Sequence, residues 1–402
     1  MKKILFGILI IIIVFLGYAF NSISCMSLPN YSFLKYIYNL KCSSNNINDS
    51  TINIPSVSTS NNQLITQSNQ NQNNNTQEQK IKKISDSKII NYTIDSNNQI
   101  IAVNNLGQII KISNQEEIIN DTIKDIPNNV LFSKDNSKII FALNNFINIF
   151  NIKNQTWKQI PNASNPTISE KNKLAYLVKN NGINSIYLLD LNKENSTPNK
   201  LIDLNILDFK LIWKDDLNLF IVSNPSSLNV GQVLLINIKD KTIKLVYELQ
   251  GIDFNWDEKT NHGLLFYSNQ AGMGGSLYLV DNNFENKKFS FTTILSKCVF
   301  NQTIFLNQQT STAQSTTTNN YIFCAVPINQ DELQNKFIID DYLTYNLYTE
   351  DEIYKINIQN KSIEKIKPEN NNQFFDIQEL KIKDNKIFFI NRFDNNLYSI
   401  EL

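Results

Sequence analysis

The four cysteines are the residues whose spacing most directly predicts chemistry. They form two pairs that are close in the sequence, Cys25 with Cys42 and Cys298 with Cys324. None of them lies in a C-x-x-C motif, which a metal site or a redox centre would favour. We therefore expect a disulfide bond between Cys298 and Cys324, with Cys25–Cys42 as a further candidate, because the N-terminal segment described below directs the chain out of the cytoplasm. Four free, buried thiols are the alternative.

Residues that could support catalysis are few. A serine triad or a Cys/His zinc site would depend on His262, the only histidine, and the chain has no G-x-S-x-G motif. The Gly-rich segment NQAGMGGS (269–276) lacks the Gly-Lys-Ser/Thr of a phosphate loop, and we interpret it as a hairpin loop. Adjacent strand residues point to opposite faces, so neighbouring acids seldom act together. Such neighbours occur at Asp215–Asp216, Asp340–Asp341 and Glu350–Asp351–Glu352.

The sequence therefore predicts no enzyme, with no catalytic residue, metal ion or cofactor. A calcium ion held in a loop stays open as an alternative, although no EF-hand spacing is present. Lysine plus arginine and aspartate plus glutamate number 37 each, so the formal net charge is zero. A general nucleic-acid-binding protein needs a basic face, and we exclude nucleic acid as a partner on this ground.

The N-terminal segment predicts a membrane anchor. Two lysines precede an apolar run of 17 residues, Ile4–Phe20, and about that many residues are needed to span a bilayer core. The positive-inside rule leaves the N-terminus in the cytoplasm and the rest of the chain outside, in the periplasm or at the cell surface. We expect a single-pass anchor in the cytoplasmic membrane at residues 1–24. Cleavage after Ala19 and lipidation of Cys25 are the alternatives.

Two segments separate this anchor from the folded part. Residues 25–42 are rich in tyrosine and lysine, and we interpret them as a juxtamembrane segment. Residues 43–79 are rich in Asn, Ser and Gln and contain no aromatic residue. Such a segment cannot bury enough apolar surface to offset the entropy of ordering, so we expect a disordered linker. It would tether a folded head, residues 80–402.

A repeated pattern organises residues 80–402. The segment LFSKDNSKIIFAL (131–143) combines an aromatic strand end, a polar turn and an apolar strand. The pattern recurs about every 35–45 residues, and four strands at this period are typical of a β-propeller blade. No long stretch after the linker has the apolar spacing of a helix. The sequence thus predicts an all-β fold, a monomeric β-propeller.

Seven blades are expected, with six or eight as alternatives. An apolar landmark marks the second strand of each blade, at Ile100, Ile139, Leu174, Leu217, Leu264, Tyr321 and Ile387. The last blade has only three strands of its own, and an unpaired strand edge invites association with other chains. We therefore predict that Lys80–Ser85 supplies the outer strand of the last blade and closes the ring.

The unit FSKDNSKIIFAL resembles the repeat of the TolB-like propeller of the Tol system and of related WD40-like repeats, F-S-P-D-G-K-K-I-A-F. The matching residues are Phe132, Ser133, Asp135, Lys138, Ile139 and Phe141. Lys134 and Asn136 replace the usual Pro and Gly. The segments KCVF, YIFCAVP and DEIYKINIQNKS resemble uncharacterised, membrane-anchored bacterial propellers of the same layout. The resemblance implies the fold and leaves the function open, because propellers serve binding, scaffolding and catalysis alike.

Two long segments are inserted in the last two predicted blades, and long loops on rigid scaffolds are frequent binding sites. The first is a hairpin between Cys298 and Cys324. The second, Pro327–Asp351, mixes acids with aromatic residues that suit a partner surface. These aromatic residues are Phe337, Tyr342, Tyr345 and Tyr348. A loop that packs over its own blade is the alternative.

We therefore expect a non-catalytic protein-binding or scaffolding module of the cell envelope, with an envelope protein as its partner. One alternative is an envelope hydrolase or lyase that acts on glycans through carboxylates in the propeller funnel. Another is a structural spacer. Converging acids in a polar funnel would favour the hydrolase, whereas an exposed aromatic patch would favour protein binding.

Overall fold

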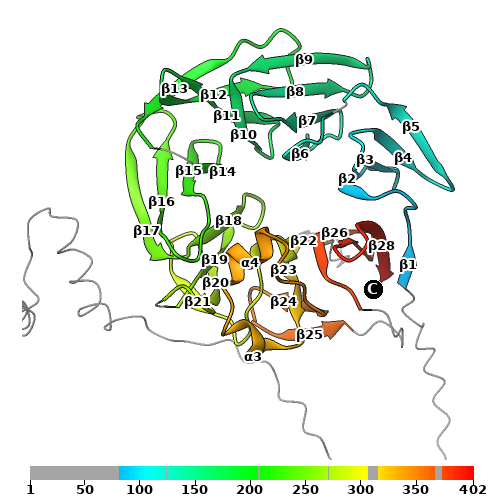
Figure 1. Ribbon diagram of the computed structural model, residues 1–402, viewed down its shortest axis with the longest axis vertical. Helices are drawn as coiled ribbons and strands as arrows, with labels where there is room; N and C mark the ends of the chain where they lie inside the picture. Colours follow the sequence, from blue (N-terminus) through cyan, green and yellow to red (C-terminus); the bar gives the residue numbers. More distant parts are fainter. Residues whose placement is uncertain (1–80, 124, 207–208, 270, 307–315, 367–373) are drawn as a thin grey trace, which may run out of the picture. The chain divides into compact units, whose positions relative to one another are not determined.

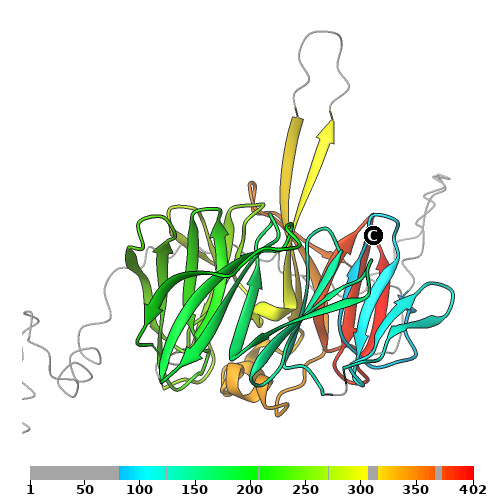
Figure 2. The same cartoon turned by 90° about the horizontal axis from the view of Figure 1, so that it is seen from above.

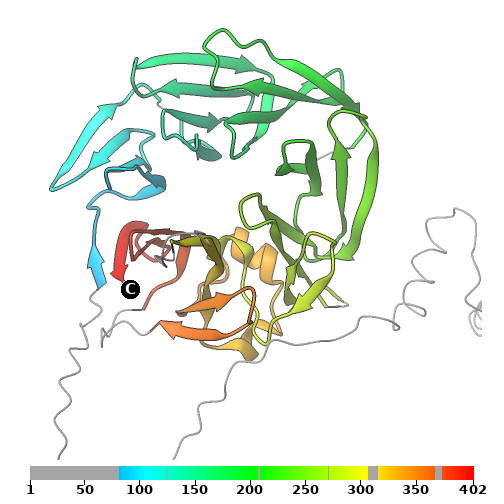
Figure 3. The same ribbon diagram turned by 180° about the vertical axis from the view of Figure 1, so that it is seen from behind.

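The structure is a computed structural model. It describes the chain from residue 81 to residue 402, except for residue 124 and the segments 207–208, 270, 307–315 and 367–373. Within these residues the strands form seven four-stranded antiparallel sheets. The sheets are arranged as the blades of a ring (Figures 1 and 3). The all-β, seven-bladed propeller predicted from the sequence is confirmed.

The predicted N-terminal segments are not part of this description. The anchor 1–24, the juxtamembrane segment 25–42 and the linker 43–79 all lie outside the described residues. In the described part of the chain, no helix has the length and apolar character needed to cross a membrane.

The blades are numbered in chain order, and each is a meander of neighbouring strands. Blades 1 and 2 contain β2 (Ile89–Ile94), β3 (Ile100–Asn104), β4 (Ile109–Ile112) and β5 (Glu116–Asn120), then β6 (Asn129–Phe132), β7 (Lys138–Ala142), β8 (Phe146–Asn151) and β9 (Thr156–Pro161). Blades 3 and 4 contain β10 (Ala163–Ile168), β11 (Lys173–Asn180), β12 (Ile183–Asp190) and β13 (Asn199–Leu204), then β14 (Phe209–Asp215), β15 (Asn218–Ser223), β16 (Val230–Asn237) and β17 (Ile243–Gln250).

The last three blades carry the departures from the regular pattern. Blade 5 contains β18 (Asp253–Asp257), β19 (His262–Tyr267), β20 (Ser276–Val280) and β21 (Asn286–Lys288), followed by the 3-10 turn η1 (Leu295–Lys297). Blade 6 contains β22 (Cys298–Leu306), β23 (Thr316–Pro327), β24 (Asp351–Asn357) and β25 (Ile363–Ile366), with the short helices α3 (Gln330–Leu333) and α4 (Ile338–Leu343) between β23 and β24. Blade 7 contains β26 (Ile377–Lys383), β27 (Lys386–Asn391), β28 (Asn396–Glu401) and β1 (Ile81–Lys83).

The strand β1 closes the ring. It pairs antiparallel with β28, with Ile81 opposite Ile400 and Lys83 opposite Tyr398. Just beyond it, the hydroxyl of Ser85 accepts a hydrogen bond from the backbone amide of Leu397 at 2.8 Å. The prediction that the segment before the first blade completes the last one is therefore confirmed.

The apolar core lies between neighbouring blades. In β7, Ile139 packs in the cluster shared with blade 1, whereas the next residue, Ile140, packs in the cluster shared with blade 3. Both side chains are completely buried. Successive strand residues point to opposite faces, and here both faces are covered. A middle strand therefore consists of an uninterrupted apolar run, as in the segment that predicted the repeat.

Asparagine forms the sharp turn between the first and second strands in five blades. Its φ angles there lie between 55 and 61°, in the left-handed region that Asn tolerates better than most residues. The residues are Asn98, Asn136, Asn172, Asn261 and Asn385. Asn136 thus takes the position of the Gly in the WD40-like repeat.

Six of the seven strand landmarks lie in second strands, as predicted. The prediction for the fourth landmark was wrong, because Leu217 lies in the turn before β15 and is 55% exposed. The apolar run of that blade begins after Asn218.

Candidate functional site

The strand order gives the ring two chemically distinct faces. In a four-stranded meander, the turns joining strands 1–2 and 3–4 lie at one end of the sheet. The 2–3 connections and the passages to the next blade lie at the other end. The end with the 1–2 and 3–4 turns is called the hairpin face, because the β22–β23 hairpin projects from it (Figure 2). The end with the 2–3 connections is called the insertion face, because the segment between β23 and β24 lies there.

The insertion, residues 328–350, is part of the folded core. Its apolar side chains join the cluster formed by blades 5 and 6. These side chains are Leu333, Ile338, Ile339, Tyr342 and Leu347, each at most 7% exposed. The insertion is therefore fixed by the same apolar contacts that hold the blades together.

Hydrogen bonds also fasten the insertion to neighbouring blades. Asp340 Oδ2 accepts from the amide of Ser227 in blade 4 at 2.6 Å. The carbonyl of Lys336 accepts from the amide of Gly274 in blade 5 at 2.8 Å. Gly274 has a φ of +65°, in the left-handed region that favours glycine, and a Cβ there would lie 3.1 Å from the backbone oxygen of Gln334. The insertion thus packs over several blades and not only over its own.

A buried ion network lies beneath the insertion, between blades 6 and 7. Lys297 Nζ donates to Asp351 Oδ2 and, at 2.5 Å, to Asp376 Oδ1. Arg392 Nη1 donates to Asp376 Oδ2 at 2.9 Å. All four side chains are at most 1% exposed. Burial raises the pKa of Asp351, and the charge of Lys297 opposes that rise. Two cations and two anions balance, so the network carries no net charge.

Arg392 connects this network with the surface. Its Nη2 donates to the carbonyl of Tyr342 at 3.0 Å. The guanidinium carbon lies 3.7, 4.8 and 5.0 Å from the ring centroids of Tyr342, Tyr345 and Tyr348. Phe393, in the β27–β28 turn, stacks on Tyr348 with ring centroids 5.6 Å apart. We call Tyr345, Tyr348 and Phe393 the aromatic patch.

The four aromatic residues predicted for the partner surface differ in exposure. Tyr345 and Tyr348 are 58% and 45% exposed. Tyr342 corrects the prediction: it is 7% exposed, because its ring faces the core from α4, and burial raises the pKa of its phenol. Phe337, at the start of α4, is half-buried. Sequence reasoning missed Phe393, which is 52% exposed and comes from another blade.

Exposed large apolar side chains are concentrated on the insertion face. In the described part of the chain, the connections of this face carry Leu106, Ile126, Leu228, Met273, Ile328, Leu343, Tyr345, Tyr348, Phe374 and Phe393. Within the same residues, the turns of the hairpin face carry only Leu217. Among the connections that the structure describes, those of the insertion face are therefore the more apolar.

The hairpin face carries the extended hairpin of β22 and β23. Their pairing runs from Cys298 opposite Cys324 to Leu306 opposite Thr316. The neighbouring strand β24 pairs only with Tyr321–Pro327 of β23. The outer part of the hairpin therefore extends beyond its sheet (Figure 2).

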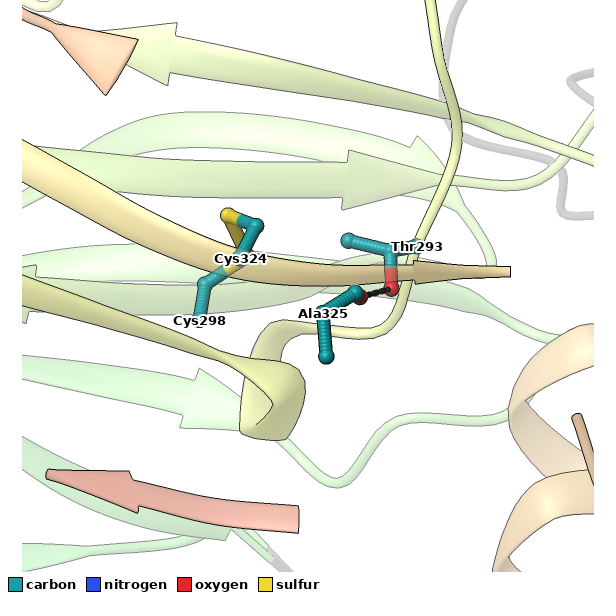
Figure 4. The surroundings of a disulfide bond; sticks show 4 residues. All are labelled: Thr293, Cys298, Cys324 and Ala325. Carbon is teal, nitrogen blue, oxygen red and sulfur yellow. Dashed lines mark hydrogen bonds between the residues drawn. A yellow bond between two sulfur atoms is a disulfide. The ribbon is translucent and has the colours of Figure 1, made fainter. Parts of the chain in front are cut away.

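A disulfide bond joins Cys298 and Cys324 at the base of this hairpin (Figure 4). The two cysteines are directly opposite each other in the strand pair. Next to them, the Thr293 hydroxyl donates to the carbonyl of Ala325 at 2.6 Å, which ties the base to the segment before η1. The other candidate pair, Cys25 and Cys42, lies outside the described residues.

A cavity of about 540 Å³ lies in the central channel of the ring. Its wall consists mainly of the innermost strands β6, β10, β14 and β18, with further residues from η1 and β26. We call it the channel cavity. Its charged lining residues are Lys134, Glu170, Lys210, Asp253, Asp257, Glu258 and Glu379.

Two glutamates from different blades lie next to each other at the hairpin-face end of this cavity. The backbone amide of Glu170, after β10, donates to Glu258 Oε1, after β18, at 3.0 Å. Lys134 and Lys259 form ion pairs with Glu170 at 2.6 and 3.2 Å. Burial acts to raise the pKa of Glu170, but these lysines lower it below its ordinary 4.5. Burial, followed by the charges of Glu170 and Asp216, raises the pKa of Glu258 to about 7.

The remaining sequence-based candidates form no catalytic arrangement. His262 begins β19, and its Nδ1 lies 2.7 Å from the carbonyl oxygen of Thr260. The segment 269–276 joins β19 to β20, as the hairpin-loop interpretation predicts. Asp215 caps its own turn, since its Oδ1 accepts from the amide of Leu217 at 2.9 Å. Among the described residues, no group of three or more His, Cys, Asp or Glu side chains could hold a metal ion.

No protein-family model matches the chain. No curated protein matches it either. Similar solved structures include a prolyl endopeptidase, with 11% identity and a TM-score of 0.45 over 81% of this chain and 50% of that one. They also include TolB from Acinetobacter baumannii (11% identity, TM-score 0.35, 68% and 62% covered) and the WD40 domain of SCAP from fission yeast (10%, 0.43, 80% and 98%).

These similarities concern the fold. The chain spans half the length of the prolyl endopeptidase. The propeller architecture itself follows from the strand order of this chain, and the function has to be argued from its own residues.

Proposed function

We propose that the chain is a non-catalytic protein-recognition module of the cell envelope and that the insertion face is its binding surface. The observation that carries the proposal is the aromatic patch, whose three rings are 45–58% exposed. Aromatic residues supply much of the energy of protein interfaces. Arg392 holds this patch from beneath, within 5.0 Å of two of its ring centroids.

The patch is attached to buried parts of the fold. Its tyrosines follow a helix whose apolar side is in the core, and its phenylalanine follows a buried arginine. A surface that is already fixed loses little conformational entropy on binding, which favours affinity. Rigid support is therefore a second argument for recognition at this face.

Charge indicates the kind of partner. The insertion exposes Asp331, Glu332 and Glu350, and its single lysine is Lys336. Complementary charge across an interface favours association and orients the partner. We expect an envelope protein that presents an apolar centre with basic residues around it.

The proposed location rests mainly on the sequence. Residues 1–24 would anchor the chain once in the cytoplasmic membrane, and the linker 43–79 would present the propeller outside the cytoplasm. The disulfide Cys298–Cys324 suits an oxidising compartment.

In-cell crosslinking of the full-length chain, followed by mass spectrometry, tests the binding surface. The test variant combines Tyr345→Ser, Tyr348→Ser and Phe393→Ser. The matched control combines Leu217→Ser, Ile118→Ser and Ile243→Ser, which also change exposed apolar residues but lie in a hairpin-face turn and in outer strands. Deleting the insertion is unsuitable, since its apolar side chains belong to the core.

We expect the wild type and the control to capture one dominant protein and the test variant to lose it. Capture of that protein by all three chains would place the binding surface elsewhere. Capture of no specific protein by any chain would contradict the proposal and favour the structural spacer.

A glycan hydrolase or lyase remains the second candidate, because the Glu170–Glu258 pair favours it. The pKa of Glu170 is lowered and that of Glu258 is raised to about 7. Pairs of carboxyl groups with such opposite shifts supply the acid and the base of glycosidases.

Release of reducing sugar ends from peptidoglycan by the full-length chain tests this candidate. A hydrolase should lose the activity when Glu258→Gln is introduced and keep it when the exposed Glu364→Gln is introduced. Absence of release by the wild type, or equal release by both variants, would exclude a role for this pair.

A further inference from the structure

Tyr345 occupies a backbone position that usually belongs to glycine. Its φ angle is +60°, in the left-handed region that bulky residues rarely adopt. The residue follows the short helix α4, whose end is closed by two backbone hydrogen bonds. The amide of Tyr345 donates to the carbonyl of Tyr342 at 3.2 Å, and the amide of Asn346 donates to the carbonyl of Asp341 at 2.8 Å. This pattern is the Schellman motif, in which glycine is the usual residue at the position of Tyr345.

A tyrosine at this position costs the fold free energy. The Cβ of an L-residue in the left-handed region approaches the backbone too closely, and glycine avoids this contact because it has no Cβ. Residues held in such conformations are found at binding and catalytic sites more often than elsewhere. The cost therefore needs an explanation in the side chain, either in its packing or in its function.

Phe284 is the other aromatic residue with a positive φ in the described part of the chain, and its ring packs in the core. Its φ angle is +66°. The ring packs against the apolar cluster between blades 4 and 5, with centroid distances of 6.0 Å to Phe220 and 6.2 Å to Trp256. Burial of apolar surface in this cluster offsets the strained turn. Packing therefore explains an aromatic residue at position 284.

The ring of Tyr345 makes no comparable contribution to the core. Tyr345 is 58% exposed, whereas Tyr342, three residues earlier, belongs to the apolar cluster of blades 5 and 6. The ring contacts of Tyr345 are with Tyr348, 6.4 Å between centroids, and with the guanidinium carbon of Arg392 at 4.8 Å. More than half of the residue still faces solvent. Packing therefore explains Tyr345 less well than it explains Phe284, and a function of the ring is the better explanation.

Arg392 fixes the turn that carries Tyr345. It comes from the β27–β28 connection of blade 7 and is buried. Its Nη2 donates to the carbonyl of Tyr342, before the turn, and its Nη1 donates to the carbonyl of Leu347, after the turn, both at 3.0 Å. A planar guanidinium holds two such acceptors in a fixed geometry. The strained turn is therefore held at both ends by a residue from another blade.

We propose that Tyr345 is the anchor residue of the insertion face and that its ring enters an apolar pocket of the protein partner. This anchor role rests on the proposed function and specifies which residue determines the choice of partner. Interface residues that dominate binding are typically aromatic or arginine side chains that fill pockets of the partner. An exposed tyrosine that weakens its own turn, and that a buried arginine holds in place, has these properties. The partner should therefore present a pocket for one ring and not only a flat apolar surface.

Replacement of Tyr345 by glycine separates binding from folding. Tyr345→Gly removes the ring and relieves the turn, whereas Tyr345→Phe keeps the ring and the strain. The matched control is Gln155→Gly, because Gln155 is exposed and uncharged and has a φ of +53° in the β8–β9 turn of the hairpin face. Each full-length chain is compared with the wild type by in-cell crosslinking with mass spectrometry and, after purification in a non-ionic detergent, by thermal melting.

We expect Tyr345→Gly to melt at the wild-type temperature or above it, because glycine adopts a positive φ without a Cβ contact. The same variant should capture the dominant partner about tenfold less, as expected for loss of a side chain that dominates an interface. Tyr345→Phe and Gln155→Gly should capture it as the wild type does. Stability and binding should thus change independently at this one position.

One result would overturn the anchor role alone and leave the proposed function standing. It is undiminished capture by Tyr345→Gly together with loss of capture by the variant with serine at all three positions of the aromatic patch. A Tyr345→Gly chain that melts at a clearly lower temperature would also overturn the anchor role, since the ring would then serve folding. Capture of no specific protein by the wild type would contradict the proposed function and the anchor role with it.

Discussion

The insertion face and the hairpin face are made by the same strands and differ in their connections. Of the large apolar side chains exposed in the described connections, the insertion face carries most, and its aromatic patch rests on a buried ion network. The hairpin face instead carries charged turn residues in ion pairs, such as Lys134 with Glu170 and Lys171 with Asp216. The blade repeat fixes the strands, so the connections are free to make two chemically different surfaces.

The two faces also differ in how deeply their ion pairs are buried. On the hairpin face, lysines that are 44–66% exposed pair near water with carboxylates that are 21–38% exposed, and such an ion pair contributes little. Beneath the insertion face, four charged side chains are removed from water and depend on one another. Changes to the buried charged groups beneath the insertion face should therefore have the larger consequences for stability.

The largest effect is expected for Lys297→Met. It leaves Asp351 buried without an ion-pair partner, while Asp376 keeps Arg392, and removing a partner from a buried ion pair costs about 3–5 kcal/mol. The free energy of unfolding, measured by urea denaturation and tryptophan fluorescence, should fall by that amount. The control Lys365→Met breaks the Lys365–Glu352 pair near the surface and should cost less than about 1 kcal/mol. Equal losses would show that burial does not distinguish the two pairs.

A somewhat smaller loss is expected when the disulfide is removed with Cys298→Ala and Cys324→Ala. The bond closes a loop with a sequence separation of 26 residues, which corresponds to about 3–4 kcal/mol in the chain-entropy model. The same denaturation experiment measures it. Because the bond lies at the base of the hairpin, crosslinking through the aromatic patch should persist at temperatures where the variant is folded. Loss of the crosslink in the folded variant would mean that the hairpin contributes to binding.

A change in pH dependence is expected for Glu258→Gln. The pKa of Glu258 is raised from 4.5 to about 7 in the folded chain, so the folded state retains a proton that the unfolded state has lost. The contribution of this group is fully present below pH 4.5 and is lost as the pH rises through about 7. The stability of the wild type should therefore decline across this window more than that of Glu258→Gln. Parallel curves from thermal melts between pH 4.5 and 8 would contradict the raised pKa.

The smallest effect on stability is expected for the aromatic patch itself. Tyr345→Ser and Phe393→Ser change side chains that are more than half exposed, and such surface substitutions usually stay within about 0.5 kcal/mol. Thermal melting of each variant measures this. A loss of several kcal/mol would show that the patch serves folding and would weaken the case for a binding surface.

The propeller could be predicted from the sequence because its signals are local. The segment LFSKDNSKIIFAL already contains a strand end, an Asn turn and a strand buried on both faces. The closing strand followed from counting, since the last blade lacked one strand and a spare segment preceded the first. Leu217 was misplaced because an exposed leucine in a turn cannot be told from a strand residue by hydrophobicity alone.

The candidate sites could be predicted only in part, because they depend on distant contacts. Tyr342 and Tyr345 are three residues apart, yet one faces the core and the other faces solvent. The ion network joins Lys297 to Arg392 through Asp376, and in the sequence all three residues are typical of a solvated surface. The contact between Glu170 and Glu258 spans 88 residues. Sequence periodicity does not predict which distant residues come into contact.

Site-specific photocrosslinking in living cells tests the central claim most directly. A photoreactive phenylalanine analogue is placed in the full-length chain instead of Tyr345 on the insertion face or, in a separate chain, instead of Leu217 on the hairpin face. The two positions have similar exposure, 58% and 55%. We predict that the analogue at position 345 captures one dominant envelope protein and that the analogue at position 217 does not. Equal capture at both positions, or capture only at position 217, would contradict recognition by the insertion face.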